Sequence, residues 1–334
     1  MSIMQFPSNE LTLVSLFAGC GGSSLGYKQA GYHVRLAVEW DQGAAKTYTN
    51  NMPETPVFVG DIASLTTTEA LSIAGLKPGE LDVLDGSPPC QGFSMAGRRT
   101  MSDNRNQLFN EYIRMIDIFQ PKMFVMENVS GLIKGKMKLM FSEMTTALRE
   151  AGYQVSCRLL NAWWYGVPQD RKRLIWIGVR NDLGIKPSHP EPTHRRPVSV
   201  GEALNIKAES EVKKALFTTS WRPYTKPDPT LIAGEQLRVR VERKQGQYPQ
   251  RPETSIFTEG PAPTLDASAR VRIEVMNDEP RPITIEEAKI LQGFPEWFQI
   301  EKYKYIGNSV APPMAKAVGE HLASLLSEKA VLLV

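Results

Sequence analysis

The chain has 334 residues, of which 42% are hydrophobic and 22% charged, and its formal net charge is +3. This composition is typical of a globular protein, and so small a net charge excludes neither a nucleic-acid enzyme nor a metabolic enzyme. No apolar run approaches the roughly 18 residues of a membrane-spanning helix, and the first ten residues lack a signal-peptide pattern. We therefore expect a cytoplasmic protein whose three cysteines are free thiols, with no metal site among its four scattered histidines.

The first half of the chain alternates short apolar segments, typical of buried strands, with longer segments typical of helices. We expect a strand at residues 11–17, then a glycine-rich turn and a helix at 23–31 with Ser23 or Ser24 as its N-cap. Because helices separate the strands, the pattern predicts an α/β fold with a doubly wound, mostly parallel sheet. Further strands are predicted at 33–39, 56–60, 81–86, 122–128, 153–162 and 173–180, with a helix at 106–119.

The pattern changes after residue 185, where a proline-rich segment predicts a linker. From there to residue 282 many prolines and weak periodicity indicate a second, smaller and irregular domain. Helical patterning returns at 284–294, with Thr284 as the N-cap, and again in the last segment, which begins at two prolines. We therefore predict a catalytic and cofactor-binding domain at 1–185, completed by 283–334, and a second domain at 186–282.

A glycine-rich turn at 18–22 follows the first strand, which is where doubly wound folds bind a cofactor. It lacks the G-K-[ST] of a phosphate loop, and Ser24 replaces the third glycine of a dinucleotide fingerprint. After the second strand, Glu39 could accept hydrogen bonds from ribose hydroxyls, and Trp40 offers a flat apolar face. Asp61, after the third strand, could accept from an adenine amino group, although each acid alone is more often a solvated loop residue. Together these features indicate an adenosine site, which favours S-adenosylmethionine over NAD.

Cys90 lies in the segment GSPPCQGFS, directly after two prolines and beyond the fourth predicted strand. An arbitrary cysteine is most often a buried structural residue, and this stays the interpretation for Cys20 and Cys157. The two prolines stiffen the chain before Cys90, which is a requirement of a nucleophile and not of a core residue. Cys90 is therefore a candidate nucleophile.

Three further charged residues are candidates for the same site. Glu127 ends the fifth strand, where desolvation lets a carboxyl group carry a proton near neutral pH. A solvated acid at a strand end is an equally good interpretation of Glu127 alone. Arg171 and Arg173 alternate, so on an extended strand both point to one side, where they could hold a carbonyl oxygen or a phosphate. The alternative for the two arginines is an exposed strand edge.

These motifs together resemble the cytosine-C5 DNA methyltransferase family of bacterial and phage type. The segments FAGCGG, EW, GDI, GSPPCQGFS, DNRNQLF, MENV, QDRKR, LQGFP and GNSVAP occur in the family's order over nearly the whole chain. The ordered set is highly specific, and Ser87 and Glu286 are mild departures from it. The resemblance implies the S-adenosylmethionine-dependent methyltransferase fold, with residues 186–282 as a target-recognition domain. It also implies methylation of C5 of a cytosine in a specific double-stranded DNA sequence.

The resemblance implies the following chemistry. The Cys90 thiolate adds to C6 of a cytosine that has left the duplex, while Glu127 protonates or hydrogen-bonds ring N3. Arg173 holds the O2 carbonyl, and Arg171 supports the loop. C5 then takes the methyl group, a base removes the C5 proton, and the thiolate is expelled. The polar loop 91–107 closes over the DNA.

The site residues implied by the resemblance fall into two further groups. Those for the cofactor are Phe17, Gly19, Gly21, Gly22, Glu39, Trp40, Asp61, Ile62, Pro89, Leu108, Asn308 and Val310. Those for DNA are Gln91, Ser94, Arg98, Arg105, Arg238, Arg240, Thr264 and Leu265.

The resemblance further implies a monomer that acts on double-stranded DNA and not at a membrane, in a restriction-modification or host-protection role. A restriction endonuclease that acts on the same site without a stable complex is an expected partner. The same chemistry on tRNA is an alternative, disfavoured because the Cys-Phe-Thr element of that branch is missing. A homologue that only binds DNA or a protein is a second alternative, disfavoured by the intact Cys90, Glu127 and Arg173. A nicotinamide oxidoreductase is disfavoured by the missing third glycine.

Overall fold

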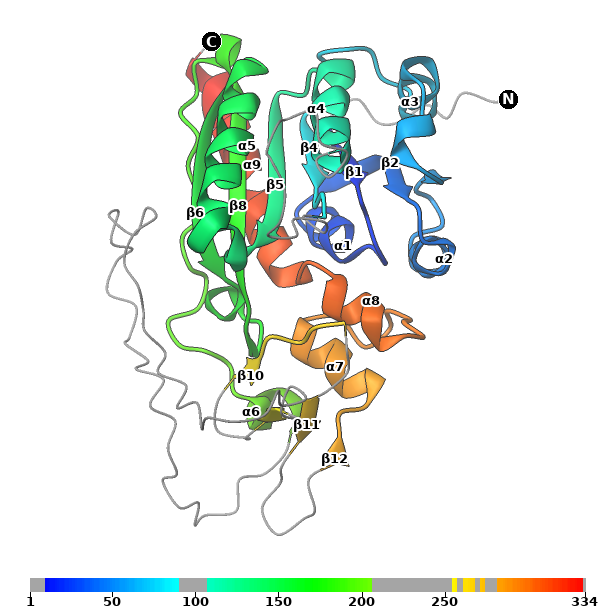
Figure 1. Ribbon diagram of the computed structural model, residues 1–334, viewed down its shortest axis with the longest axis vertical. Helices are drawn as coiled ribbons and strands as arrows, with labels where there is room; N and C mark the ends of the chain where they lie inside the picture. Colours follow the sequence, from blue (N-terminus) through cyan, green and yellow to red (C-terminus); the bar gives the residue numbers. More distant parts are fainter. Residues whose placement is uncertain are drawn as a thin grey trace.

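The computed structural model of the chain describes residues 10–89, 107–205, 254–256, 261–267, 271–273 and 281–332 (Figure 1). Its centre is a sheet of seven strands in the order β3-β2-β1-β4-β5-β8-β6. Neighbouring strands are parallel except where β8 pairs with β5 and β6. The predicted doubly wound, mostly parallel sheet is therefore confirmed. The strands are β1 (Leu11–Leu16), β2 (Tyr32–Glu39), β3 (Val57–Val59), β4 (Val83–Gly86), β5 (Met123–Val129), β6 (Tyr153–Asn161) and β8 (Lys172–Arg180).

Helices cover both faces of the sheet because successive strand side chains point to opposite faces. On one face, apolar residues of the strands share a core with α3 (Thr67–Ala74), α4 (Gln107–Phe119) and α5 (Lys138–Glu150). On the other face, a second core joins the strands to α1 (Gly22–Gln29) and α9 (Pro312–Leu332). Neighbouring residues divide between the two cores, with Val14 in the first and Leu13 in the second. This alternation explains why short apolar runs predicted the strands well.

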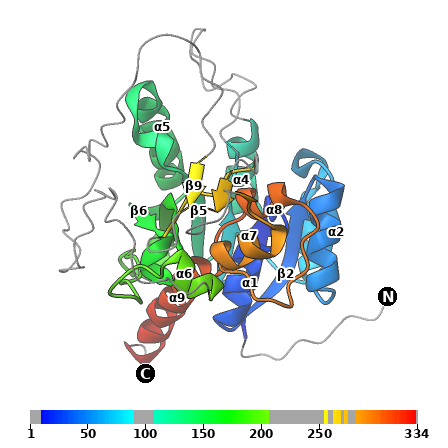
Figure 2. The ribbon, with the colours of Figure 1, turned by 90° about the horizontal axis from the view of Figure 1, so that it is seen from below.

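The last helix packs directly on the first. A Cβ atom at Gly26 of α1 would collide with the Pro312 carbonyl of α9 and lie 2.6 Å from the Cβ of Ala315. Only glycine allows the two helices to approach so closely. Residues almost 300 positions apart in the sequence are thus neighbours in the structure, as the views in Figures 1 and 2 agree.

The start of α1 differs from the prediction. The N-cap is Gly21, in the left-handed region with φ of 97°, and it makes no side-chain cap hydrogen bond. Ser23 and Ser24 lie inside the helix and are buried, so the prediction of a serine N-cap is wrong. The glycine turn, with backbone angles that other residues rarely adopt, sets the helix start in place of a side-chain cap. The predicted Thr284 cap of α7 (Ile285–Gln292) is confirmed by a complete capping box.

The proline-rich segment after residue 185 has no helix or strand, but it is not a free linker. His189 is buried, and its Nε2 lies 2.9 Å from the Ile175 carbonyl oxygen of β8. The Tyr165 hydroxyl donates to the Pro190 carbonyl at 3.1 Å. The segment therefore packs on the large sheet, and the division of the chain into domains at this point stays a prediction.

Smaller elements lie beyond the carboxyl ends of the parallel strands (Figures 1 and 2). β7 (Gln169–Asp170) pairs in parallel with β10 (Ala262–Pro263). α6 (Val200–Leu204) contacts α7, and α7 contacts α8 (Tyr303–Asn308). A third sheet has the order β12-β11-β9. Its strands are β9 (Thr254–Ile256), β11 (Val271–Ile273) and β12 (Arg281–Pro282). α2 (Gln42–Asn51) packs against the same group.

Candidate active site

A tight glycine turn follows β1. Phe17, Gly19 and Gly21 all have positive φ, at 55°, 57° and 97°. A Cβ atom at Gly22 would collide with the Ser309 hydroxyl and the Val310 carbonyl. The turn after α8 therefore lies against the glycine turn. This contact brings the predicted cofactor residue Gly22 next to Val310, from the other end of the sequence.

Glu39 closes the end of β2 and is 7% exposed. Its carboxylate accepts the backbone N–H groups of Gly19 at 2.7 Å, Trp40 at 3.0 Å and Asp41 at 2.8 Å. A carboxylate has about four acceptor positions, so one remains for a ligand hydroxyl. Trp40 beside it is 80% exposed, which leaves its ring face open. The end of β2 thus presents an acid and an aromatic face together.

The other predicted cofactor residues follow neighbouring strands. Asp61, after β3, caps a short 3-10 helix by accepting the Ala63 amide at 3.0 Å, and Ile62 is buried. Pro89, after β4, is exposed, and Leu108 lies in the first turn of α4 with 36% exposure. Since β1, β2, β3 and β4 are parallel, their carboxyl ends meet at one edge. Asn308 and Val310 reach this edge from the α8–α9 turn.

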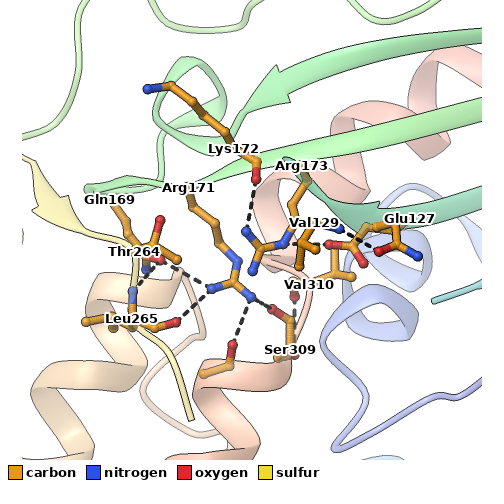
Figure 3. Close-up of polar contacts among 12 residues, drawn as sticks. Glu127, Val129, Gln169, Arg171, Lys172, Arg173, Thr264, Leu265, Ser309 and Val310 are labelled. Carbon is orange, nitrogen blue, oxygen red and sulfur yellow. Dashed lines mark hydrogen bonds and ion pairs between the residues drawn. The ribbon is translucent and has the colours of Figure 1, made fainter. Parts of the chain in front are cut away.

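Glu127 and Arg173 form an ion pair at the same edge of the sheet. The Arg173 Nε lies 2.7 Å from a Glu127 carboxylate oxygen, and each side chain is 11% exposed (Figure 3). The antiparallel register of β5 and β8, which places Val129 opposite Arg173, brings the two together. A hydrogen bond between two charged groups is stronger than a neutral one. The site therefore holds a carboxylate and a guanidinium in fixed geometry.

Asn128 fixes the segment that leads to Cys90. Its side-chain amide donates to the Pro88 carbonyl at 3.1 Å, and it is 5% exposed. The bond joins β5 to the segment that follows β4, in which Pro88 is buried. We did not single out Asn128 from the sequence, although it lies inside the MENV motif. Its position beside Glu127, at the end of a predicted strand, could have indicated a role in the site.

Arg171 has different partners from Arg173 (Figure 3). It is 1% exposed, and its guanidinium donates to the carbonyls of Leu265 at 2.9 Å, Gly307 at 2.9 Å and Ser309 at 2.7 Å. Burial and the neighbouring Arg173 charge lower the pKa of Arg171 well below its usual value. Leu265 is buried, while Thr264 is exposed and donates to the Asp170 carbonyl at 2.6 Å. The terminal nitrogens of Arg171 thus donate to three backbone carbonyls and, at 3.4 Å, to the Gln169 side chain.

A second buried carboxyl group lies on β4. Asp85 is 4% exposed and accepts a hydrogen bond from the Ser15 hydroxyl at 3.4 Å. Burial, together with the Glu127 charge, raises the pKa of Asp85 to about 7, although hydroxyl groups such as that of Ser23 act in the opposite direction. Asp85 was not predicted as a site residue, because it lies inside a short apolar run that is typical of a buried strand.

The cysteines within the described residues are structural in character. Cys20 is 1% exposed, and burial raises the pKa of its thiol to about 12. Burial also raises the pKa of Cys157, and both residues are free thiols. A thiol that stays protonated is a poor nucleophile, which agrees with the structural interpretation of both residues.

Part of the predicted site lies outside the described residues. This applies to Cys90 and to the predicted DNA contacts Gln91, Ser94, Arg98, Arg105, Arg238 and Arg240. Within the described ranges, no helix is long and apolar enough to cross a membrane. The same ranges contain no group of three or more His, Cys, Asp or Glu residues able to hold a metal ion.

Comparisons with known proteins agree with this geometry. The chain is 33% identical to the type II methyltransferase M.XorII of Xanthomonas oryzae pv. oryzae, over 95% of this chain and 85% of that protein. It is 33% identical to M1.HphI of Haemophilus parahaemolyticus, over 93% of this chain and 86% of that protein.

Solved structures share the fold. A structure described as a DNA modification methyltransferase encoded within a prophage (E. coli) matches with a TM-score of 0.70 and 26% identity, over 95% of this chain and 99% of that one. The DNMT2 of Spodoptera frugiperda matches with a TM-score of 0.64 at 19% identity, over 95% of this chain and 99% of that one, which supports the fold alone. The family model of C-5 cytosine-specific DNA methylases matches residues 11–324. The chain therefore belongs to this family and is a DNA cytosine-5-methyltransferase.

Proposed function

We propose that this enzyme methylates a flipped-out cytosine in double-stranded DNA through a covalent adduct of Cys90 with C6 of the ring. The observation that supports the proposal most is the Glu127–Arg173 ion pair. Glu127 lies on β5 beside Asn128. The Asn128 side chain donates a hydrogen bond to the carbonyl of Pro88, which lies two residues before Cys90. An acid, a guanidinium and a thiol at one edge are what this addition requires.

The residues at the carboxyl edge fit S-adenosylmethionine. The exposed ring of Trp40 offers a surface for the adenine, and the remaining acceptor position of Glu39 suits a ribose hydroxyl. A Cβ atom added at Gly19 would meet nothing within 4 Å, so there is open space beside the glycine turn. When bound there, S-adenosylmethionine supplies an electrophilic methyl group. Phe17, Gly21, Gly22, Asp61, Ile62, Pro89, Leu108, Asn308 and Val310 would complete its site.

The side chains of this enzyme then have separate tasks. The Cys90 thiolate adds to C6, which makes C5 nucleophilic, and Glu127, once it has taken a proton from solvent, donates this proton or a hydrogen bond to N3. Arg173 would hold the O2 carbonyl while remaining beside Glu127. After C5 has taken the methyl group, a water molecule removes the C5 proton. The C6–sulfur bond then breaks to release the product and the thiolate, and N3 returns its proton to Glu127.

We further propose a restriction-modification role, which rests on the type II methyltransferases among the relatives. A cognate endonuclease would then act on the same site without a stable complex with this chain, which we propose to be a monomer. Residues 186–282 would recognise the target, with Thr264 and Leu265 on the DNA side. The DNA contacts would also include Gln91, Ser94, Arg98, Arg105, Arg238 and Arg240.

Bisulfite sequencing of DNA from cells that express the chain tests the proposed activity and identifies the target site. A duplex with 5-fluorocytosine at that site should form a stable covalent complex in the presence of methyl donor. The Cys90→Ser variant should still bind the duplex, but it should form no adduct and transfer no methyl group. Normal turnover by this variant, or transfer to tRNA and not to duplex DNA, would contradict the proposal.

A further inference from the structure

Buried hydrogen bonds join two segments that the proposed function assigns to different ligands. Arg171 donates through one terminal nitrogen to the Leu265 carbonyl and through the other to the Gly307 and Ser309 carbonyls. Leu265 is 94 positions from Arg171 in the sequence, and Ser309 is 138 positions away. One planar guanidinium therefore sets the distance between the segment after β10 and the α8–α9 turn.

The two segments also touch each other directly. A Cβ atom at Gly307 would collide with the Asp266 carbonyl and lie 2.7 Å from the Ala267 amide nitrogen. Glycine is thus required at the end of α8 for the backbone of 265–267 to lie on it. This contact is independent of the Arg171 hydrogen bonds and joins the same two segments.

A second buried path runs beside Arg171. The Leu265 amide donates to the Gln169 side chain at 3.0 Å, which donates to Gln292 at 2.7 Å. Gln292 in turn donates to the Ser309 carbonyl at 2.7 Å. Gln169 and Gln292 are 0% exposed, so water cannot replace a partner that moves away. The segments are therefore constrained to shift together.

We propose that Arg171 is a positioning residue that couples DNA binding to cofactor binding. The inference rests on the proposed function, in which the exposed Thr264 contacts DNA and Asn308 and Val310 contact the cofactor. DNA that holds Thr264 also fixes its buried neighbour Leu265 and, through Arg171, the Ser309 carbonyl between the two cofactor residues. By linkage, the cofactor must strengthen DNA binding by the same factor.

The test is the dissociation constant of S-adenosylhomocysteine with and without saturating duplex that contains the target site. For the wild type we expect the duplex to tighten binding by about 5-fold or more. In Arg171→Lys the ratio should fall below about 2-fold, because a lysine ammonium lacks the planar fork that holds both segments. Gly307→Ala, which separates the same segments sterically, should lower the ratio in the same way. The dissociation constant of each variant for S-adenosylhomocysteine alone is the reference for its own ratio, so a change in basal cofactor binding does not alter the measured coupling.

Arg149→Lys and Gly131→Ala are matched controls. Arg149 is exposed on α5, and a Cβ at Gly131 would meet nothing within 4 Å. Both should keep the wild-type ratio. A folded Arg171→Lys or Gly307→Ala protein with the wild-type ratio would overturn the inference.

A measurement on the wild type remains decisive if neither test variant folds. Saturating duplex without cofactor should slow amide hydrogen exchange in residues 303–310, and unchanged exchange there would overturn the coupling. If the wild type methylates the duplex but shows no coupling, only this inference fails. If it does not methylate the duplex, the proposed function fails.

Discussion

At the scale of single residues, Asp85 is a carboxyl group in the centre of the sheet. It lies opposite Ser15 of β1 and Val125 of β5, so it has strands on both sides. Its raised pKa, to about 7, means that the folded protein binds a proton more tightly than the unfolded chain, whose carboxyl has the ordinary value of 3.8. Folding therefore favours the protonated form, and stability falls as pH rises from about 4 to about 7.

The Asp85→Asn variant should remove this pH dependence. An amide cannot ionise, so the variant should lose little stability across the window in which the wild type loses about 1–4 kcal/mol. Urea unfolding of both proteins at several pH values measures the difference. Parallel stability curves for the two proteins would show that Asp85 does not titrate in this range.

Glu127→Gln tests the acid of the ion pair. A glutamine cannot donate an acidic proton to N3 and leaves the Arg173 charge unpaired, so kcat should fall by about 10²- to 10⁴-fold. Methyl transfer at saturating duplex and methyl donor measures this loss. Glu143→Gln, at an exposed position on α5, should keep the wild-type rate. A Glu127→Gln enzyme with normal kcat would exclude Glu127 from proton transfer.

At the scale of elements, the sequence predicted where strands lie but not the direction of β8. Apolar runs report burial and length, whereas direction depends on the connections between strands. The direction matters for the site, because only the antiparallel pairing of β8 with β5 brings Arg173 to Glu127. Glu39, Glu127 and the glycine turn were found because each lies at the end of a predicted strand or directly after it. Gln169 and Gln292 were missed, since their partners are 96 and 17 positions away and mostly belong to the backbone.

The packing of α1 on α9 predicts that replacing a helical glycine by alanine lowers the stability of the protein, which is the opposite of the usual effect. Replacing a helical glycine by alanine usually stabilises a helix by about 1 kcal/mol. At Gly26 the new methyl group would meet Ala315 at 2.6 Å, so we expect a loss of about 1–3 kcal/mol. Chemical denaturation compares this variant with Gly131→Ala, whose methyl group would meet nothing within 4 Å. A more stable Gly26→Ala protein would contradict the packing described for α1 and α9.

At the scale of the whole molecule, the core between the large sheet, α1 and α9 combines residues from segments far apart in the sequence. That core contains Leu13 and Val34 as well as Met314 and Leu322, and all four are at most 1% exposed. Neither end can bury its apolar side chains without the other. We therefore expect cooperative unfolding of the part of the chain that the structure describes.

A chain that stops at residue 311 should not fold. Without α9, the apolar face around Leu13 and Val34 stays open to water, at a cost of about 25 cal/mol for each Å² of apolar surface. Circular dichroism should show no cooperative transition, and a peptide of residues 312–332 added in excess should restore part of it. A cooperative transition of the shortened chain alone would contradict this account.

The contact of α9 with α1 also has a consequence for biosynthesis. Ribosomes add about 5–20 residues per second, so α1 leaves the ribosome roughly 15–60 s before α9 does. During that interval the nascent chain exposes the apolar surface that α9 will cover, and exposed apolar surface of this kind favours aggregation. The newly made protein therefore becomes able to modify DNA only after α9 has left the ribosome.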